Sequence, residues 1–571
     1  MKKKIIALVA AALTALSVSA FCACKTGEPP ADEPELPVDW LDSEENKENF
    51  SAGGYVKGKT GDFTQYENTD AYRKVSTADE FVSAVVAAKC HYTNVWDDAT
   101  NTYTQIPAEG YTEETMWGSV RVIEITQDLN LGYYNLSSAA KGSGVVDDYA
   151  KNLPKWDGLL SNFDTVLENG ISQIKIENTS NLLVYSKTGA KITYAGFKLT
   201  SDNNVVFRNL QFDGLWQWED APVNSTAKIG DYDWYGWAYF KIAFCGYTWI
   251  DHCTFGKSYD GQIDCSNPVY NANAGTAFRA PLGADGNNGL QISWCNFNAG
   301  SDDKDGYIYK EMQKIEQGYL AGKTDHLYYK SLRDAGVSFE QILYGIAIPQ
   351  KKGFLCGDDA KFSGSYENAD DYNFNLKLRV SFANCKFINL EDRLPKLRGG
   401  NAYMYNCVVD SSQYYKYRTE LKTLNAASIV SKVNGTWKCG LVSQGIVCGN
   451  GGSVMAESCI FRGIDSLLKN NDSKNTAPYV NGGYSIVNCS YQRGEGEKEY
   501  IGSSSDPSPG FPNATPAKLK TEFFKWNTAD GKQPFTVRAI GVESLEEYLS
   551  HEKYGSGVRT EISDKLLKSS Y

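Results

Sequence analysis

Histidine and methionine are scarce in this sequence of 571 residues, with four and five copies. No CxxC or HxxxH spacing occurs, so we expect no zinc chemistry. The chain also lacks an excess of basic residues, since 57 Lys and Arg stand against 69 Asp and Glu, for a net charge of −12. An acidic chain of this kind argues against nucleic acid as a partner, and it can bind a polyanion only through locally placed cations.

Long apolar runs are missing beyond the N-terminus, and no later segment is apolar enough to cross a bilayer. Residues 1–24 begin with three lysines and continue with a short apolar stretch, a pattern typical of an export signal. The stretch ends in SAFCAC, and Cys24, which follows the small Ala23, is the predicted lipidation site. Cys22 follows the bulky Phe21 and fits less well, and an ordinary secretory signal with incidental cysteines is the alternative. A lipidated Cys24 would tether an exported protein to the bacterial cell surface, and this anchor would be its only membrane contact.

Residues 25–54 are acidic, rich in proline and low in hydrophobicity. This composition predicts an extended, disordered tether. We expect one folded domain over 55–571, acting as a monomer. The 13% aromatic content and the 52 glycines favour a β protein with many turns.

A strand pattern recurs along the chain at irregular spacing. Its copies are RNLQF at 208–212, DHCTF at 251–255, SWCNF at 293–297, NCKF at 384–387, NCVV at 406–409, SCIF at 458–461 and NCSY at 488–491. They share one position that holds Leu210 and then six cysteines, at 253, 295, 385, 407, 459 and 489. Residues 385 and 407 are 22 apart, and 253 and 295 are 42 apart, close to two such units. Short strands that repeat with this period predict a parallel β-helix, in which stacked coils hide one side of every strand.

The cysteines follow this repeat. Fourteen cysteines in an exported protein would ordinarily indicate disulfides. Six of them at one position of a repeat instead predict an interior ladder of small apolar side chains, a role that free cysteine fills well. We therefore expect mostly unpaired, buried thiols.

Two segments depart from the strand pattern. Residues 77–90 open with Thr77 and Glu80 at the spacing of a capping box and continue one apolar face. This predicts a short amphipathic helix that caps the end of the β structure. Residues 302–348 also carry helical patterns, and their length favours an insertion that projects from the coils, near the working face, over a separate domain.

The stretch WIDHCTFGKSYDGQID, residues 249–264, places Asp260 and Asp264 four residues apart after a strand. On an extended backbone, positions i and i+4 lie on the same face. Two like charges on one face repel each other unless a cation lies between them, and a hard divalent ion with oxygen ligands meets this need. Taken alone, the pair is more often two solvated surface carboxylates.

Several motifs together give the chain a family resemblance. VVFRNLQF, WIDHCTF, YDGQID, NGLQISWCNF, KKGFLCGDD and RLPKLRGG occur in the order, and with nearly the wording, of the pectate lyase family, polysaccharide lyase family one. The resemblance covers most of residues 75–490. It implies an all-β fold, a right-handed single-stranded parallel β-helix, with a Ca2+-dependent cleft on one sheet. The implied reaction is β-elimination on polygalacturonate, an acidic plant cell-wall polysaccharide, or on a relative of it.

The same resemblance implies roles for five residues. Asp260 and Asp264 would bind Ca2+, Lys352 would assist at the substrate carboxylate, and Arg393 would abstract the proton. Arg398 would bind substrate or support catalysis. A base role for arginine requires neighbouring cations that disfavour its charge, because its pKa is normally above about 12. Without the resemblance, both arginines would be interpreted as solvated charges or carboxylate binders.

The chain departs from the family pattern at two positions. Where the family usually has an aspartate thirteen residues before the WIDH aspartate, this chain has Ala238. Asp231 and Asp233 are the nearby carboxylates that could replace it, and Asp233 is the tentative third Ca2+ ligand. Tyr403 stands where the family often has histidine, and Lys351 is the alternative for the cleft lysine. These changes leave the reaction type standing but bear on the metal site and on fine specificity.

Aromatic and polar residues near the central stretch allow more than one interpretation. Tryptophans at 216, 218, 234 and 237 are either sugar-stacking platforms or loop-packing residues, and Trp237 is the tentative substrate-binding choice. Asp251 and His252 have the residue types of catalytic groups. Because they lie inside WIDHC beside the predicted ladder, we interpret them as structural.

Three other functions stay open. A hydrolase on the same fold would need paired acids, and its motifs are not visible. A catalytically silent, glycan-binding surface protein is favoured by Ala238 alone and disfavoured by the joint presence of Lys352, Arg393 and Arg398. A lyase acting on a different or esterified uronate polymer is the third.

Overall fold

The computed structural model describes the chain between Phe50 and Ser569, with gaps. The described residues are 50–97, 102–150, 168–218, 236–265, 288–323, 326–349, 352–357, 378–424, 432–433, 436–437, 443–449, 451–470, 483–496, 500–502, 522–524, 526, 531–552, 554–560 and 562–569. All of them belong to one compact unit, Lys47–Tyr571. The predicted export signal at 1–24 with its Cys24, and most of the predicted tether at 25–54, lie outside the described residues.

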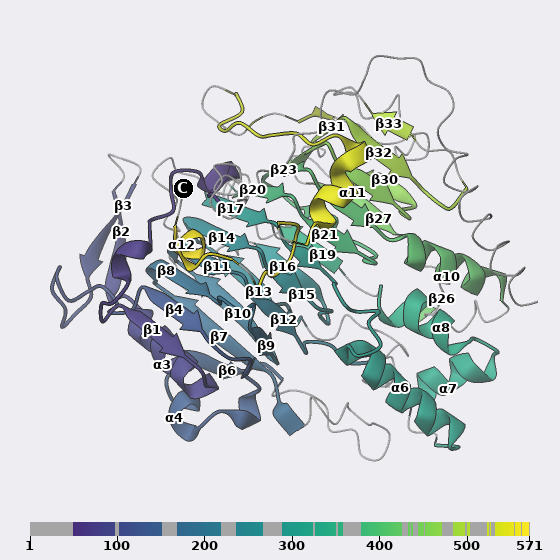
Figure 1. Cartoon of the computed structure of the whole chain (residues 1–571), viewed down its shortest axis with the longest axis horizontal. Helices are drawn as coiled ribbons and strands as arrows, with labels where there is room; N and C mark the ends of the chain where they lie inside the picture. Colours follow the sequence, from purple (N-terminus) through teal and green to yellow (C-terminus); the bar gives the residue numbers. More distant parts are fainter. Residues whose placement is uncertain are drawn as a thin grey trace, which may run out of the picture. The chain divides into compact units, whose positions relative to one another are not determined.

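Three long sheets, built mostly of parallel strands, make up this unit (Figure 1). The eleven-stranded sheet contains, in spatial order, β1 (Tyr72–Val75), β4 (Val122–Ile125), β8 (Ser180–Tyr185), β11 (Asn203–Arg208), β14 (Tyr247–Asp251), β17 (Asn288–Ser293), β20 (Leu378–Ala383), β23 (Asn401–Tyr405), β28 (Ser453–Glu457), β31 (Gly483–Val487) and β34 (Glu522–Phe523). The ten-stranded sheet contains β33 (Tyr500–Gly502), β32 (Cys489–Gln492), β29 (Ile460–Arg462), β24 (Val408–Asp410), β21 (Lys386–Ile388), β18 (Asn296–Phe297), β15 (Thr254–Phe255), β12 (Gln211–Asp213), β9 (Lys191–Thr193) and β5 (Leu129–Asn130). The nine-stranded sheet contains β30 (Ser466–Asn470), β27 (Gln444–Cys448), β22 (Lys396–Leu397), β19 (Lys352–Cys356), β16 (Gly261–Cys265), β13 (Phe240–Ala243), β10 (Ala195–Thr200), β7 (Ser172–Glu177) and β6 (Val146–Asp148). Two antiparallel pairs stand apart, β2 (Tyr92–Asp97) with β3 (Thr102–Pro107) and β25 (Lys432–Val433) with β26 (Thr436–Trp437).

One coil of the chain visits all three sheets in turn. β13 lies in the nine-stranded sheet, β14 in the eleven-stranded, β15 in the ten-stranded, and β16 returns to the nine-stranded sheet beside β13. Parallel register joins the coils, with Phe240 beside Ile263 and Phe212 beside Phe255. The predicted parallel β-helix is therefore confirmed, and its strands follow one another along the stack in chain order (Figure 1).

The predicted repeat marks one corner of the coils. At this corner a strand of the eleven-stranded sheet ends, one residue takes a left-handed backbone conformation, and a strand of the ten-stranded sheet follows. The left-handed residues have φ between +48° and +56° and are Asn209, His252, Trp294, Asn384, Asn406, Ser458 and Asn488. Four of the seven are asparagine, which tolerates this conformation better than most L residues.

The residue after each bend forms the predicted ladder. Backbone hydrogen bonds of 2.8–2.9 Å connect Leu210 and the first five ladder cysteines to the following coil, so successive members lie one coil apart. All eleven described cysteines are free and buried, as predicted. Phenyl rings two residues further on repeat this stacking, because the Phe297 ring lies 4.8 Å from that of Phe255 and 4.6 Å from that of Phe387. Part of the core is thus built from columns of like side chains.

The predicted capping helix is present as α3 (Ala78–Ala88). Thr77 and Glu80 form the capping box, with the Glu80 N–H donating to Thr77 Oγ1 at 3.2 Å. Phe81 is fully buried and packs edge-on against Phe197 of β10, at 6.2 Å between ring centres. The helix therefore covers the N-terminal coils with its apolar face.

The predicted insertion is also helical and lies between β18 and β19. It contains α6 (Tyr307–Leu320), α7 (Leu327–Asp334), α8 (Phe339–Ile342) and the π-helix η5 (Leu343–Ala347). Trp218 stacks on Tyr328 at 5.4 Å, and the Tyr307 hydroxyl donates to the Trp216 carbonyl at 2.9 Å. The other described helices are η2 (Gly54–Val56), η3 (Thr64–Tyr66), η4 (Tyr133–Asn135), α4 (Ser138–Lys141), α10 (Ser412–Thr423), α11 (Val542–Ser550) and α12 (Asp564–Lys568).

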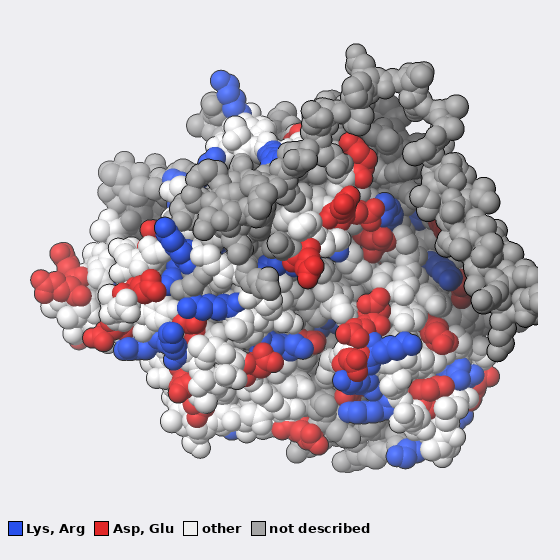
Figure 2. Space-filling view, viewed as in Figure 1, with Lys and Arg blue, Asp and Glu red and all other residues white. Residues whose placement is uncertain are grey.

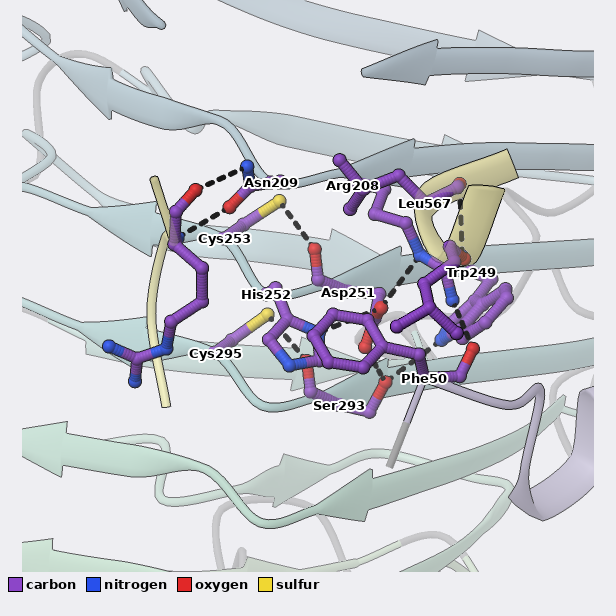
Figure 3. A network of polar contacts seen from close by, with 12 residues as sticks. Phe50, Arg208, Asn209, Trp249, Asp251, His252, Cys253, Ser293, Cys295 and Leu567 are labelled. Carbon is purple, nitrogen blue, oxygen red and sulfur yellow. Dashed lines mark hydrogen bonds and ion pairs between the residues drawn. The ribbon is translucent and has the colours of Figure 1, made fainter. Parts of the chain in front are cut away.

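Arg208 ties both ends of the described chain to the central coils (Figure 3). Its side chain is 1% exposed, and its Nε donates to Asp251 Oδ2 at 2.8 Å. The guanidinium also donates to the Phe50 carbonyl at 2.7 Å and to three carbonyls of α12 and its C-cap at 2.9–3.1 Å. The Trp249 ring covers the guanidinium at 4.0 Å. One buried cation therefore holds the N-terminal and C-terminal segments on the same coil.

Asp251 and His252 are fully buried in the same network (Figure 3). Asp251 accepts from Ser293 Oγ at 2.5 Å, and the His252 ring is stacked against Phe50 at 4.1 Å and Trp294 at 5.6 Å. This burial is consistent with the structural interpretation of the pair. Phe50, five residues before the predicted boundary at 55, is already packed against the coils.

Charges of both signs are mixed on the described part of one face of the molecule (Figure 2). Lys and Arg alternate with Asp and Glu over the described part of the face in Figure 2. Among the described residues, no helix combines the length and apolar character needed to cross a bilayer. Because the described part of the face in Figure 2 has no region of one charge sign, a charged ligand would have to be bound by a small local group of residues.

Replacement of Arg208 tests the role of this buried network. We expect Arg208→Met to lower the free energy of unfolding by about 3–5 kcal/mol, because Asp251 loses its buried cationic partner. Equilibrium urea unfolding measures the change. The matched control is Arg462→Met, which removes an arginine from a 2.6 Å surface pair with Glu546 and should cost less than about 1 kcal/mol. Equal effects of the two substitutions would contradict the assignment.

Candidate active site

A cluster of charged side chains lies on the outer face of the nine-stranded sheet. Ile263 and Cys265 of β16 are buried, so Asp264 between them points outward. Asp260 lies directly before this strand. Both aspartates contact Arg393, which places them together as the i, i+4 spacing predicted.

Lys352 joins the cluster from the next coil. It is the first residue of β19 and lies beside Gly261 of β16 in parallel register. Its Nζ lies 3.2 Å from Asp260 Oδ1, and the two side chains are 16% and 18% exposed. This half-buried pair gives Asp260 a fixed cationic neighbour. The alternative lysine, Lys351, lies outside the described residues.

Arg393 reaches the cluster from the coil that follows. Its backbone is left-handed, with φ +62°, and its N–H donates to Asp392 Oδ1 at 2.6 Å, while its carbonyl accepts from the Phe354 N–H at 2.8 Å. A non-glycine residue in this conformation costs about 1–3 kcal/mol and persists only where its surroundings hold it. The guanidinium Nη1 lies 3.1 Å from Asp264 Oδ1, and Nη2 lies 3.6 Å from Asp260 Oδ1.

Asp264 is the electrostatic centre of the cluster. Burial raises the pKa of its carboxyl above the ordinary value, and Asp260 raises it further. Arg393, Lys241 and Lys352 act on the same pKa in the opposite direction. If all five of these described side chains are counted as charged, two aspartates at −2 and three basic residues at +3 sum to +1. That formal count suits an anionic ligand.

Lys241 is a member that the sequence analysis missed. It lies on β13, directly beside Asp264 in parallel register. Two buried apolar residues flank it, so it points outward from the sheet. The alternation in AYFKIA could have shown that this lysine faces outward. The sequence alone could not predict that the strand of Lys241 pairs with the strand of Asp264.

Two further basic residues lie on and after β22. Lys396 Nζ is 3.9 Å from Asp392 Oδ2. Burial lowers the pKa of Lys396, and the charges of Arg398, Arg393 and Lys352 lower it further, against the opposite effect of Asp392. Arg398 therefore lies close enough to act electrostatically on this edge of the cluster.

The described residues fit a Ca2+ ion in part. Asp260 and Asp264 offer carboxylate oxygens, whereas Ca2+ takes about six to eight oxygen ligands, so the remainder would come from water or substrate. Among the described residues, no group of three or more His, Cys, Asp or Glu is placed to hold a metal. Ala238 is buried and offers no donor side chain. The proposed replacements, Asp231 and the tentative ligand Asp233, lie outside the described residues.

The tryptophans near the cluster pack the coils. Those at positions 216, 218 and 237 are 0%, 4% and 1% exposed. Trp237 meets Tyr259 edge-on at 5.3 Å, and its Nε1 donates to the Tyr149 carbonyl at 3.2 Å. This burial leaves the Trp237 ring no open face for a sugar, which disfavours its tentative substrate role. Trp234 lies outside the described residues.

Tyr403, the second departure from the family pattern, lies away from the cluster. It is fully buried on β23 of the eleven-stranded sheet, and its hydroxyl donates to Glu457. Burial raises the pKa of its hydroxyl, and the bond to Glu457 raises it further. Tyrosine at this position therefore has a packing and hydrogen-bonding role.

Comparison with known proteins gives the following matches. No family model matches the chain. The chain is similar to pectate lyase B of Paenibacillus amylolyticus, with 27% identity over 418 residues, 73% of this chain and 87% of that protein. A shorter match, 28% identical over 123 residues, links it to the pectate trisaccharide-lyase of Thermotoga maritima and covers 22% of this chain and 26% of that one. Among solved structures it is similar to a pectate lyase of Paenibacillus sp. 0602, with a TM-score of 0.69, 24% identity, and coverage of 92% of this chain and 99% of that one.

These matches agree with the motifs and with the fold. The longer sequence match spans most of the chain, and the structural match includes nearly all of both chains. The named relatives are polysaccharide lyases, so the predicted family resemblance and enzyme class are confirmed at the level of homology. The chain is a homologue of the pectate lyases and has the parallel β-helix fold of that family.

Proposed function

We propose that the protein is a pectate lyase that cleaves polygalacturonate by β-elimination, with Arg393 as the base and Ca2+ as cofactor. The observation that carries this proposal is the convergence of Arg393 on both Asp260 and Asp264, with Lys352 beside Asp260, from three successive coils. Similarity to pectate lyase B supports the substrate class. A cluster with a net positive charge also suits an acidic polymer.

Elimination removes the proton at C5 of a uronate and expels the oxygen at C4. The C5–H electron pair becomes the C4–C5 double bond, the C4–O bond breaks, and the leaving oxygen takes a proton from solvent. The C5 proton is weakly acidic while the adjacent carboxylate keeps its full charge. In this proposal Lys352 donates to that carboxylate, and Ca2+ bound by Asp260 and Asp264 would add positive charge at the same group.

Arg393 can accept the C5 proton only as a neutral guanidine, although arginine ordinarily stays protonated. Lys352 and Lys241 disfavour its positive charge, whereas Asp260 and Asp264 favour it. The guanidinium contacts the Oδ1 atoms of both aspartates, which are the proposed metal ligands. To act as the base, Arg393 must therefore break its contacts with these carboxylates and approach the C5 proton of the substrate.

Product analysis tests the reaction type. Polygalacturonate with Ca2+ should give unsaturated oligomers, detected by the ultraviolet absorbance of the new double bond, and a chelator should abolish the rise. A hydrolase would give new reducing ends with no such absorbance, and a silent glycan-binding protein would give neither. No absorbance rise on polygalacturonate with Ca2+ would overturn the proposal.

Replacement of the base should affect the chemical step. We expect Arg393→Ala to lower kcat by about 10²- to 10⁴-fold, the range for loss of a general base, and to remove the basic group from the pH–rate profile. Arg393→Lys keeps a positive charge beside the aspartates. Comparing it with Arg393→Ala therefore separates the effect of losing the charge from the effect of losing the guanidine base. An Arg393→Ala variant with unchanged kcat would contradict the assignment.

Gly261 has no side chain, and the ends of the Arg393 and Asp264 side chains fill the space beside it. A Cβ at Gly261 would lie 2.8 Å from Arg393 Nη1 and 2.8 Å from Asp264 Oδ1. Gly261→Ala should therefore displace two side-chain ends and lower kcat by roughly ten- to a hundredfold, with little change in the unfolding midpoint. Gly318→Ala on α6 is the matched control, because its Cβ would meet only the Lys323 side chain at 3.7 Å. Equal kcat values for Gly261→Ala and Gly318→Ala would contradict the prediction, because activity would then not depend on the positions of the Arg393 and Asp264 side chains.

A further inference from the structure

Lys241 and Asp264 occupy one row of outward positions on the nine-stranded sheet. Lys198 lies beside Lys241 on the preceding strand, and Lys396 lies two strands beyond Asp264. Neighbouring strands are about 4.8 Å apart. Lys241 is therefore one strand away from Asp264, on the side opposite the strand that carries Lys352.

The Lys241 side chain is held in place. Its Nζ lies 5.5 Å from the centre of the Tyr149 ring, within the range of a cation–π contact. The Tyr149 hydroxyl donates to the Gly236 carbonyl at 2.8 Å, which fixes the ring. A Cβ at Gly236 would lie 3.4 Å from Lys241 Nζ, so the ammonium lies close to this residue. The charge therefore has a defined position at the edge of the cluster.

Lys241 differs from the neighbouring cations in its partners. Lys352 and Arg393 form ion pairs with the aspartates at 3.1–3.6 Å. Lys241 forms no ion pair within the part of the chain that the structure describes. Burial lowers the pKa of Lys241, but Tyr149, Asp264 and Asp260 raise it above the ordinary value, so the ammonium is charged at neutral pH. Its hydrogen-bond donors are thus not engaged by a described carboxylate.

The same segment has alanine where a third carboxylate was expected. Ala238 lies three residues before Lys241 and is 1% exposed. Within the described residues 236–243, the segment therefore contributes a fixed cation, and no acid, to this side of Asp264. A fixed cation attracts an anionic sugar directly and repels a metal ion, because both effects follow from the sign of its charge.

We propose that Lys241 is a substrate-binding residue whose ammonium binds the carboxylate of one uronate unit, on the side of Asp264 opposite Lys352. The choice of a uronate as the ligand of Lys241 rests on the proposed pectate lyase function. Lys241 also makes sugar binding less dependent on Ca2+, and it weakens the binding of Ca2+ to the sugar-free protein.

Calorimetric titration of the full chain tests this role without an activity assay. With trigalacturonate in chelator, Lys241→Gln should weaken binding about tenfold, the loss expected for one charge-assisted hydrogen bond, while Lys241→Arg should bind nearly as the parent does. With Ca2+ and no sugar, Lys241→Gln should bind the ion more tightly, because a repelling charge has been removed. Failure of the parent chain to bind trigalacturonate in chelator would overturn the proposal.

Lys198→Gln is the matched control. It lies in the same row one strand earlier, and its Nζ is 3.9 Å from Glu177 Oε1, so it should change neither titration. Equal losses from Lys198→Gln and Lys241→Gln would overturn the proposal, as would a loss in Lys241→Gln that comes with a lower melting temperature and is not rescued by arginine. If the parent yields no unsaturated product but binds trigalacturonate through Lys241, the elimination is wrong and the binding role stands.

Discussion

Hydrogen bonding between successive coils is the constraint on which the rest of the structure depends. Because the strands pair in parallel register, a residue's position within its strand decides both the face and the row that it occupies. One left-handed residue at each repeated corner keeps this register, although the loops differ in length. The charged cluster can therefore combine Lys241, Asp264, Lys352 and Arg393, which are far apart in the sequence.

Within this frame the aspartates and their cations depend on one another. Asp260 and Asp264 are half-buried like charges, which Lys352 and Arg393 offset at close range. Arg393 is held in a strained backbone conformation by its neighbours, which fixes its side chain against both carboxylates. The contacts that stabilise the acids are thus the same contacts that the proposed reaction has to rearrange.

The sequence predicted the features that repeat or that form a motif. The seven bend segments indicated the β-helix and the cysteine ladder, and the spacing of Asp260 and Asp264 placed them together. It could not predict contacts that depend on register between distant coils. Lys241 meets Asp264 only through strand pairing, and Arg208 reaches carbonyls 358 and more residues away. The burial of Trp237 likewise follows from the packing of neighbouring coils, which residue type alone does not reveal.

Cations on both sides of Asp264 bear on which polymer the site prefers. Lys352 lies on one neighbouring strand and Lys241 on the other, so a bound chain would meet a positive charge on each side of the aspartates. A free carboxylate can satisfy such a charge, whereas a methyl ester can only accept a weaker, neutral hydrogen bond. A polymer with consecutive free carboxylates would satisfy both lysines at once. If both lysines bind substrate as proposed, the arrangement would favour de-esterified over esterified polyuronate, by a difference that grows with each ester placed opposite a lysine.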